Sequence, residues 1–256
     1  MSPPLLVEDR GPIRILTLNR PAARNAIDDA TTIALVEALT QLDHDTGLRV
    51  GIITGAPPGF CAGMDLKAFA RGERSRVPHG GFAGLTRHPP AKPLIAAIEG
   101  FAIAGGLEIA LACDLIVAGE DAVLGLPEPS LGIVAAAGGA LRVPARIAYH
   151  RATELLLTGR PISGQRAAEI GLITRSVEPG TALSVALDLA TAIAANSPHA
   201  IRITKALLGL ATVSPSEDVW RAHDEIAIPA LESDEAREGA TAFTQHRPPA
   251  WRTDHR

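Results

Sequence analysis

Two glycine-rich segments that each run into an acidic residue are the first feature of the sequence that could support chemistry. They read FCAGMD at residues 60–65 and AGGLE at residues 104–108. Glycine lets a ligand approach the main chain closely, and the first N–H groups of a helix are unpaired at the positive end of its dipole. Two such donors would stabilise an oxygen atom that gains negative charge during a reaction. Ordinary loop-to-helix turns have the same glycine pattern, so both interpretations stay open.

Glu108 is the second feature, because it lies in the apolar run GLEIALAC at residues 106–113. A buried carboxylate without compensation costs several kcal/mol or takes up a proton. Glu108 follows Gly105 by three residues, and helical side chains lean toward the helix N-terminus, so the carboxylate can share a cavity with the Gly105 N–H. The apolar surroundings favour a functional acid. The alternative is a first-turn glutamate that only interacts with the helix dipole.

Glu128 lies between Pro127 and Pro129, which restrict its backbone. We expect the following proline to hold Glu128 in an extended conformation and thereby to fix its carboxylate. Two carboxylates in one pocket would allow general acid and general base catalysis on a single substrate. A solvated loop acid has the same sequence features, and the sequence does not show whether Glu108 and Glu128 converge.

Motifs of several other chemistries are missing from the sequence. The eight histidines form no HExxH or HxH pair, so no metal site is predicted. The glycine clusters lack the GK[ST] ending of a phosphate loop and the GxGxxG spacing of a dinucleotide site, and no GxSxG motif is present. Cys61 and Cys113 belong to no CxxC pair, so we expect reduced, apolar thiols. Redox chemistry and nucleotide hydrolysis are therefore not expected.

The composition describes a globular chain that can bury a full core, with 256 residues of which 46% are hydrophobic. A net charge of -4 and only 3% aromatic residues disfavour nucleic acid and anionic membrane surfaces as partners. The longest uncharged apolar run, residues 131–141, is far shorter than the ~20 residues of a membrane span. With no targeting pattern at the N-terminus, we expect a cytoplasmic protein without a nucleic-acid or membrane partner.

Short apolar runs alternate with helical patterns through the first part of the chain. Strands are expected at residues 13–18, 50–54, 93–98 and 114–118, and a short buried helix at residues 105–112. Another helix should begin at Asp28 or Asp29, and its apolar face contains Ile33, Val36, Leu39 and Leu42. Helices placed between strands indicate an α/β layer arrangement.

The later segments differ in character. Residues 72–90 mix Gly, Pro, Arg and His without periodicity, and we expect a flexible cover there. Ser163 should cap a helix that ends at Gly171, followed by a strand-like piece at residues 172–177. From about residue 196 only helices are expected, and their apolar faces suggest docking or oligomerisation. Their boundary signals are Ser214-Pro215-Ser216-Glu217, Ser233 and Pro248-Pro249.

Taken together, these segments resemble the crotonase, or enoyl-CoA hydratase/isomerase, family over nearly the whole chain. Four ordered motifs carry the resemblance: NRPAARNAI at 19–27, FCAGMDL at 60–66, EGFAIAGGLEIALACD at 99–114, and PEPSLG at 127–132 followed by Gly138-Gly139. The tail from Ser233 through Phe243 to Pro249 and Trp251 is also similar to the C-terminal helix of the family. The chain departs from the family pattern at Glu99, Ala104 and His246, where Asn, Gly and Lys are frequent.

The resemblance implies an α/β fold, a crotonase-like spiral of repeated ββα units with a C-terminal helical oligomerisation domain. Residues 1–195 would form the spiral with an acyl-CoA site, and residues 196–256 the trimerisation domain. The implied assembly is a homotrimer or a dimer of trimers. The implied substrate is an acyl thioester of coenzyme A, and no cofactor is needed beyond coenzyme A as part of the substrate.

The resemblance also implies residue roles. The N–H groups of Ala62 and Gly105 would hold the thioester oxygen, Glu108 would deprotonate the water that attacks C3, and Glu128 would exchange the proton at C2. Substrate-binding positions would be Ala22, Arg24, Asp65, Leu66 and Phe243. Arg24 suits pairing with a phosphate, and a plain surface charge is the alternative.

An enoyl-CoA hydratase, a hydro-lyase, is the resulting hypothesis, because family members that only isomerise or cleave commonly lack one of the two glutamates. An enoyl-CoA isomerase and a specialised acyl-CoA dehydratase are the alternatives within the same chemistry. A non-catalytic acyl-CoA-binding scaffold is the alternative from a different class.

Overall fold

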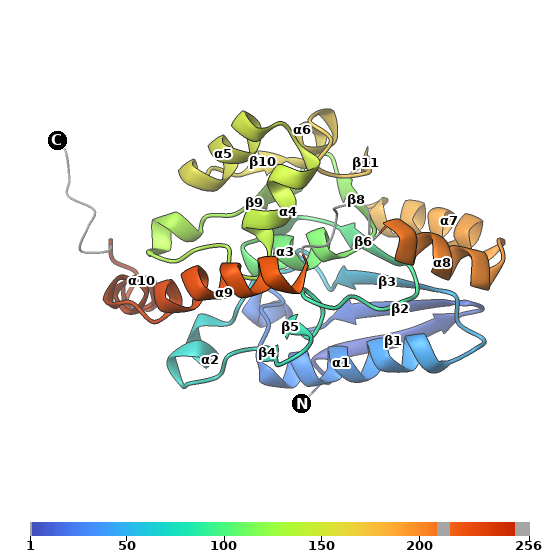
Figure 1. Cartoon of the computed structure of the whole chain (residues 1–256), viewed down its shortest axis with the longest axis horizontal. Helices are drawn as coiled ribbons and strands as arrows, with labels where there is room; N and C mark the ends of the chain where they lie inside the picture. The colour runs from blue at the N-terminus through green and yellow to red at the C-terminus, as the bar shows by residue number, and fades with distance from the viewer. Residues whose placement is uncertain (1, 209–215, 249–256) are drawn as a thin grey trace.

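A six-stranded sheet forms the centre of the computed structural model, which describes residues 2–208 and 216–248 (Figure 1). Its strands, in spatial order, are β1 (Leu5–Arg10), β2 (Ile13–Leu18), β3 (Val50–Gly55), β6 (Leu94–Ile98), β8 (Leu115–Gly119) and β11 (Arg175–Val177). Only the β1–β2 pair is antiparallel, and the other neighbours run parallel. The four strands expected from apolar runs are confirmed within one or two residues at their ends.

A second sheet has three strands. It consists of β10 (Ile162–Ser163), β9 (Val123–Gly125) and β7 (Phe101–Ile103), and a parallel bridge between Cys61 and Ala102 continues it. The chain passes from β6 to β7 and then into α3 (Gly105–Ala112), and from β3 through Cys61 into α2 (Leu66–Ala70). Each turn thus adds a strand to both sheets and then a helix, which confirms the spiral of ββα units.

Helices cover both faces of the large sheet, as a largely parallel sheet requires. On one face lies α1 (Asp29–His44), capped by Asp28, whose side chain accepts from the Thr31 N–H. Leu39 and Leu42 of α1 are buried as expected, but Ile33 is wrong as a core residue, since it is 57% exposed. The buried stripe follows Leu35 and Ala38 instead, because the helix meets the sheet along a slightly rotated face.

The other face is covered by α7 (Ala182–Ala194), whose fully buried residues are all alanines. Ala182, Ala186, Ala190 and Ala194 recur every four residues and pack in one cluster with Val50 and other strand residues. Small side chains let the helix backbone approach the sheet closely. The Glu99 carboxylate fixes the start of this helix by accepting from the N–H groups of Gly180 (3.0 Å) and Ala182 (2.8 Å).

The remaining helices come after β9 in the chain. They are α4 (Gly139–Arg146), α5 (Tyr149–Thr158), α6 (Gly164–Glu169), α8 (Pro198–Leu208), α9 (Glu217–Leu231) and α10 (Asp234–Thr244). Ser163 and Ser233 cap α6 and α10 as expected. Ser214, Pro215, Pro249 and Trp251 lie outside the described residues. Within the described residues no helix is long and apolar enough to cross a membrane.

The two helices α9 and α10 fold back over the spiral (Figure 1). α9 runs across the front of α3, and α10 packs against α2 and against the 3-10 helix η2 (Glu128–Leu131). The backbones of α10 and η2 lie close together, since a side chain at Gly239 would meet the carbonyl oxygen of Leu131. The division of the chain at residue 195 stays a prediction.

The cover over residues 72–90 is more regular than its sequence suggests. It contains a two-stranded hairpin of β4 (Arg76–Val77) and β5 (Gly81–Phe82). Its anchors are Ser75, whose hydroxyl donates to the carbonyl of Ile27 at 2.9 Å, and the fully buried Leu85. The segment thus contains a short hairpin that its aperiodic sequence did not predict, because strands this short have no period to detect. The flexibility of the cover stays a prediction.

Candidate active site

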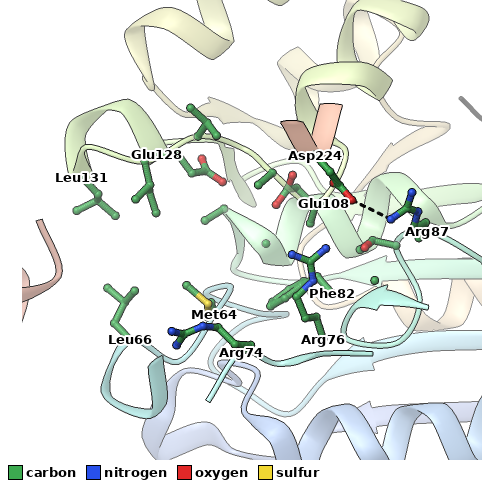
Figure 2. Close-up of a pocket in the computed structure, with 18 of the residues that line it drawn as sticks. Met64, Leu66, Arg74, Arg76, Phe82, Arg87, Glu108, Glu128, Leu131 and Asp224 are labelled. Carbon is green, nitrogen blue, oxygen red and sulfur yellow. Dashed lines mark hydrogen bonds and ion pairs between the residues drawn. The ribbon is translucent and has the colours of Figure 1, made fainter. Parts of the chain in front are cut away.

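A largely apolar pocket of about 130 Å³ lies between α3, the cover and α9 (Figure 2). Both glycine-rich segments reach it, and so do both glutamates. Its lining consists of Ala62, Met64, Leu66, Arg74, Arg76, Gly81, Phe82, Thr86, Arg87, Ala104, Gly105, Glu108, Glu128, Leu131, Ile133, Val134, Ala136, Ala137, Trp220 and Asp224. The tertiary structure therefore brings together groups from five separate parts of the chain.

Glu108 lies in the first turn of α3, where it is only 3% exposed. Its Oε1 atom accepts a hydrogen bond of 2.8 Å from the N–H of Gly139. Burial raises the pKa of Glu108 to about 7, while the Gly139 and Ala137 N–H groups and the Arg142 charge act in the opposite direction. The carboxyl group is thus oriented by the start of α4 and can change its protonation state near neutral pH.

Glu128 lies beside Glu108 in the pocket (Figure 2) and is also 3% exposed. Burial first, and then the charge of Glu108, raise the pKa of Glu128 to about 8. Its Oε2 atom has no hydrogen-bond partner among the described residues. A buried oxygen of this kind, unpaired and facing a cavity, is free to bind a substrate atom or a water molecule.

The backbone at Glu128 differs from the sequence expectation. Glu128 is the first residue of η2 and does not lie in an extended segment. Pro129 occupies the second position of this helix, where its missing N–H removes no internal hydrogen bond. The two prolines still fix the carboxylate, but by starting a helical turn.

The Gly105 N–H has no acceptor among the described residues, because Gly105 is the first residue of α3. The Ala62 N–H, in contrast, donates to the carbonyl of Arg24 at 3.1 Å. Its proton already has a partner inside the protein, so the expected pair of Ala62 and Gly105 amides is wrong in this structure. Ala62 contributes only its surface to the pocket.

The Met64 N–H is the second amide near Gly105 without an acceptor in residues 2–208 and 216–248. Met64 and Ile27 form a parallel bridge, whose hydrogen bonds run from Ile27 to Gly63 (2.8 Å) and from Asp65 to Ile27 (2.9 Å). In such a bridge the N–H of the central residue points to the opposite side, and Met64 lines the pocket. Sequence reasoning missed this residue, because N–H direction alternates along an extended segment and the partner that sets it is distant in sequence.

The two free amides lie close together because of Gly63. Gly63 has a φ of +93°, and a Cβ atom built on it would lie 2.9 Å from the nitrogen of Gly105. Only glycine lets the segment from Ala62 to Met64 pass this close to the start of α3. The sequence signal for this contact is the glycine itself.

The expected substrate-binding residues divide into two groups. Leu66 lines the pocket beside Met64, whereas Ala22, Arg24 and Phe243 are exposed and do not line it. The Arg24 guanidinium lies 4.4 Å from the centre of the Phe101 ring. Their contacts with substrate stay predictions.

The Asp65 carboxylate stabilises the start of α2. It accepts from the N–H groups of Lys67 (3.0 Å) and Ala68 (3.1 Å) and pairs with Arg20 at 2.9 Å. Asp65 therefore caps α2 and holds the Met64 segment in place. A contact of Asp65 with substrate stays a prediction.

Charged residues that the sequence did not single out also reach the pocket. Arg74, Arg76 and Arg87 come from the cover, and Asp224 comes from α9. Arg87 donates to Asp224 at 2.9 Å and to Glu217 at 2.8 Å. No group of three or more potential metal-ligating side chains occurs within residues 2–208 and 216–248.

Comparisons with known proteins agree with this geometry. The profile of the enoyl-CoA hydratase/isomerase family matches residues 8–254. The enoyl-CoA hydratase EchA19 of Mycobacterium tuberculosis is 41% identical over 254 residues, covering 96% of both chains. A carnitinyl-CoA dehydratase of Salmonella paratyphi A is 40% identical, covering 98% of this chain and 99% of the relative.

A solved structure gives the same result at the level of the fold. The enoyl-CoA hydratase EchA1 from Mycobacterium marinum superimposes with a TM-score of 0.81 at 50% identity, covering 97% of this chain and 98% of that one. The match extends over the spiral and the helical tail alike. The chain belongs to the enoyl-CoA hydratase/isomerase family.

Proposed function

We propose that this protein is a hydro-lyase that reversibly adds water across the 2,3 double bond of an enoyl-CoA thioester. One observation carries the proposal: two buried glutamates, Glu108 and Glu128, reach one apolar pocket beside the free amides of Met64 and Gly105. Oxyanion-binding amides and a pair of acids with different surroundings are the parts that such an addition needs.

The proposed reaction starts with the thioester oxygen accepting hydrogen bonds from Met64 and Gly105. The Glu108 carboxylate, held by Gly139, takes a proton from water while the water oxygen bonds to C3. The electron pair of the double bond moves toward the thioester, whose oxygen gains negative charge at the two amides. Glu128 then delivers its proton to C2, which completes the addition of one water molecule.

The protonation states of the two glutamates support this division. Their raised pKa values and their proximity favour one ionised and one protonated carboxyl near neutral pH. Glu108 is the base, because two N–H groups and the Arg142 charge favour its charged form. Glu128 keeps its proton because burial and the neighbouring charge both oppose ionisation.

The same groups run the reverse reaction, which dehydrates a 3-hydroxyacyl thioester. The name of the Salmonella relative, carnitinyl-CoA dehydratase, supports this direction as a second candidate for the chain. The chemistry uses the protein's side chains, its amides and water, with coenzyme A as part of the substrate. A homotrimer or a dimer of trimers, and a cytoplasmic location, remain predictions.

The test compares Glu108→Gln and Glu128→Gln with the wild type on a short 2-enoyl-CoA, following the loss of the conjugated absorbance. Each variant should lose hydration by roughly 100–10,000-fold. Glu120→Gln is the control, because Glu120 is an exposed acid that does not line the pocket. A near-wild-type rate in either pocket variant removes the role assigned to that residue.

The same experiment also distinguishes an enzyme from a non-catalytic acyl-CoA-binding scaffold. A wild-type protein that binds enoyl and 3-hydroxyacyl thioesters, but converts neither over graded chain lengths, is a carrier and no enzyme. Migration of the double bond without addition of water identifies an isomerase.

A further inference from the structure

The cover supplies three arginines to the pocket, and they differ in how their charge is satisfied. Arg87 is paired with the carboxylates of Asp224 and Glu217. Arg74 lies 4.7 Å from the centre of the Phe69 ring and donates to the carbonyl of Glu73 at 3.2 Å. These two guanidinium groups are already engaged by the protein.

Arg76 is different, because nothing within the described part of the chain pairs with its guanidinium. Its side chain rises from β4 into the pocket, with the guanidinium beside Phe82 (Figure 2). The two acids nearest the reaction centre do not satisfy this charge, since Glu108 is bonded to Gly139 and Glu128 has an unpaired oxygen. Arg76 is exposed, and among the arginines that line the pocket it is the one for which the described residues show neither an ion pair, a hydrogen bond nor a ring contact.

The position of Arg76 relative to the free amides follows from the hairpin register. Arg76 and Phe82 are directly opposite each other in the antiparallel β4–β5 pair, so their side chains share a face. The Phe82 ring in turn packs on Gly105, since a Cβ built there would lie 2.6 Å from the ring. The Phe82 ring thus lies between Arg76 and the Gly105 amide, which would hold the thioester oxygen.

We infer that Arg76 makes this site selective for a short acyl group that ends in a carboxylate. This inference rests on the proposed function and names its substrate class. The cavity of about 130 Å³ is similar in size to cavities that hold benzene, so a chain of about six carbons fills it. A guanidinium binds a carboxylate through two parallel N–H bonds, which a methyl terminus cannot accept.

The experiment compares two thioesters that differ only at the far end of the acyl chain. They are hex-2-enoyl-CoA and the same molecule with a terminal carboxylate in place of the methyl group. The wild type should prefer the carboxylate in kcat/KM, and Arg76→Met should lower the ratio of the two values by about 10–100-fold. Arg76→Lys should keep part of the preference, because it keeps the charge but loses the bidentate geometry.

Arg71→Met is the matched control. Arg71 precedes the same hairpin, is exposed, pairs with Glu73 and does not line the pocket. This variant should leave the ratio at the wild-type value. A wild type that prefers the methyl terminus or a trimethylammonium terminus, or a ratio that Arg76→Met does not change, overturns the inference.

A binding experiment separates this inference from the proposed function and from phosphate binding. Calorimetry with the saturated pair, hexanoyl-CoA and adipyl-CoA, measures the preference without any turnover. Tighter binding of adipyl-CoA that Arg76→Met abolishes supports the inference even if hydration is absent. Equal weakening of both thioesters and of free coenzyme A shows that Arg76 holds a phosphate of coenzyme A, and overturns it.

Discussion

The chemistry of this protein depends, at the scale of single residues, on two carboxyl groups that share one largely apolar pocket. In the part of the chain that the structure describes, no cation forms an ion pair with Glu108 or Glu128. The charge of Arg142 lowers the pKa of Glu108, but Arg142 donates its hydrogen bonds to the carbonyls of Thr86 and Ala137. Two negative charges in such a pocket are unfavourable, so at least one proton is retained near neutral pH.

This arrangement predicts a pH-dependent stability. Both folded pKa values lie above the ordinary value of 4.5, so the folded state binds protons more tightly than the unfolded chain. The contribution of Glu108 and Glu128 is complete below pH 4.5 and is lost as pH rises through about 7 and about 8. The Glu108→Gln/Glu128→Gln variant should therefore gain at least about 1 kcal/mol over the wild type between pH 5 and pH 9. Urea unfolding at both pH values measures the gain, and a constant difference contradicts the raised pKa values.

Gly63 gives a second prediction at this scale. Gly63→Ala should lose activity by at least about 10-fold, because its methyl group would lie 2.9 Å from the Gly105 nitrogen and crowd the thioester oxygen. The control is Gly171→Ala, which has a similar positive φ of +80° but no neighbour within 4 Å. Both variants should lose about 1 kcal/mol of stability from backbone strain. Equal loss of kcat/KM in the two variants would show that the contact with Gly105 has no catalytic consequence.

At the scale of elements, α3 is the helix that holds the site. All eight of its residues are buried, and its first turn provides both the Gly105 amide and the Glu108 carboxylate. The residue before it, Ala104, has φ 53° and ψ -127°, a conformation that suits glycine. Its N–H donates to the carbonyl of Gly125 at 2.9 Å, which ties the start of α3 to β9. The strain therefore persists because the surrounding strands fix this turn.

Ala104→Gly should raise the free energy of unfolding by about 1 kcal/mol. The gain from relieved strain exceeds the extra entropy that glycine adds to the unfolded chain. Chemical denaturation of the variant and the wild type checks the value. Ala195→Gly serves as the comparison, because Ala195 has a helical φ of -71° and should lose stability on the same change. Destabilisation in both would mean that Ala104 is not strained.

At the scale of the whole molecule, the helical tail completes the pocket. Trp220 of α9 is buried, with the guanidinium groups of Arg87 and Arg142 at 5.1 and 5.6 Å from the centre of its ring system. The tail also leaves apolar side chains in contact with water, among them Ile203 and Leu207 four residues apart on α8. Such a stripe is typical of a helix that packs against another subunit.

The family resemblance predicts a homotrimer or a dimer of trimers, so sedimentation equilibrium should give a mass three or six times that of one chain. Leu207→Asp should shift the mass toward the monomer, because it places a charge in the apolar stripe. Ser184→Asp adds the same charge at an exposed polar position of α7 and should leave the mass unchanged. A monomeric wild type at micromolar concentration would rule out the predicted trimer.

The elements that the sequence predicted well are those with a strong local period or a terminal signal. The buried strands β3 and β6 and the helix α3 were predicted nearly to the residue, since long apolar runs admit few alternatives. β1, β7, β9 and β10 were not predicted. β1 is exposed along most of its length, and the other three have at most three residues each. Such strands are selected by pairing partners and have no pattern of their own.

For the site, the sequence by itself determined which residues carry the chemistry: an acid in an apolar helix at Glu108, an acid between prolines at Glu128, and two glycine-rich turns. Only the tertiary structure decided that the acids share a pocket, that Met64 and not Ala62 offers its amide, and that Arg76 enters without a partner from the described residues. Residue type and local backbone preference are properties of neighbours in the chain. The direction of an amide, the pairing of a charge and the burial of a carboxyl group depend on segments that only folding brings together.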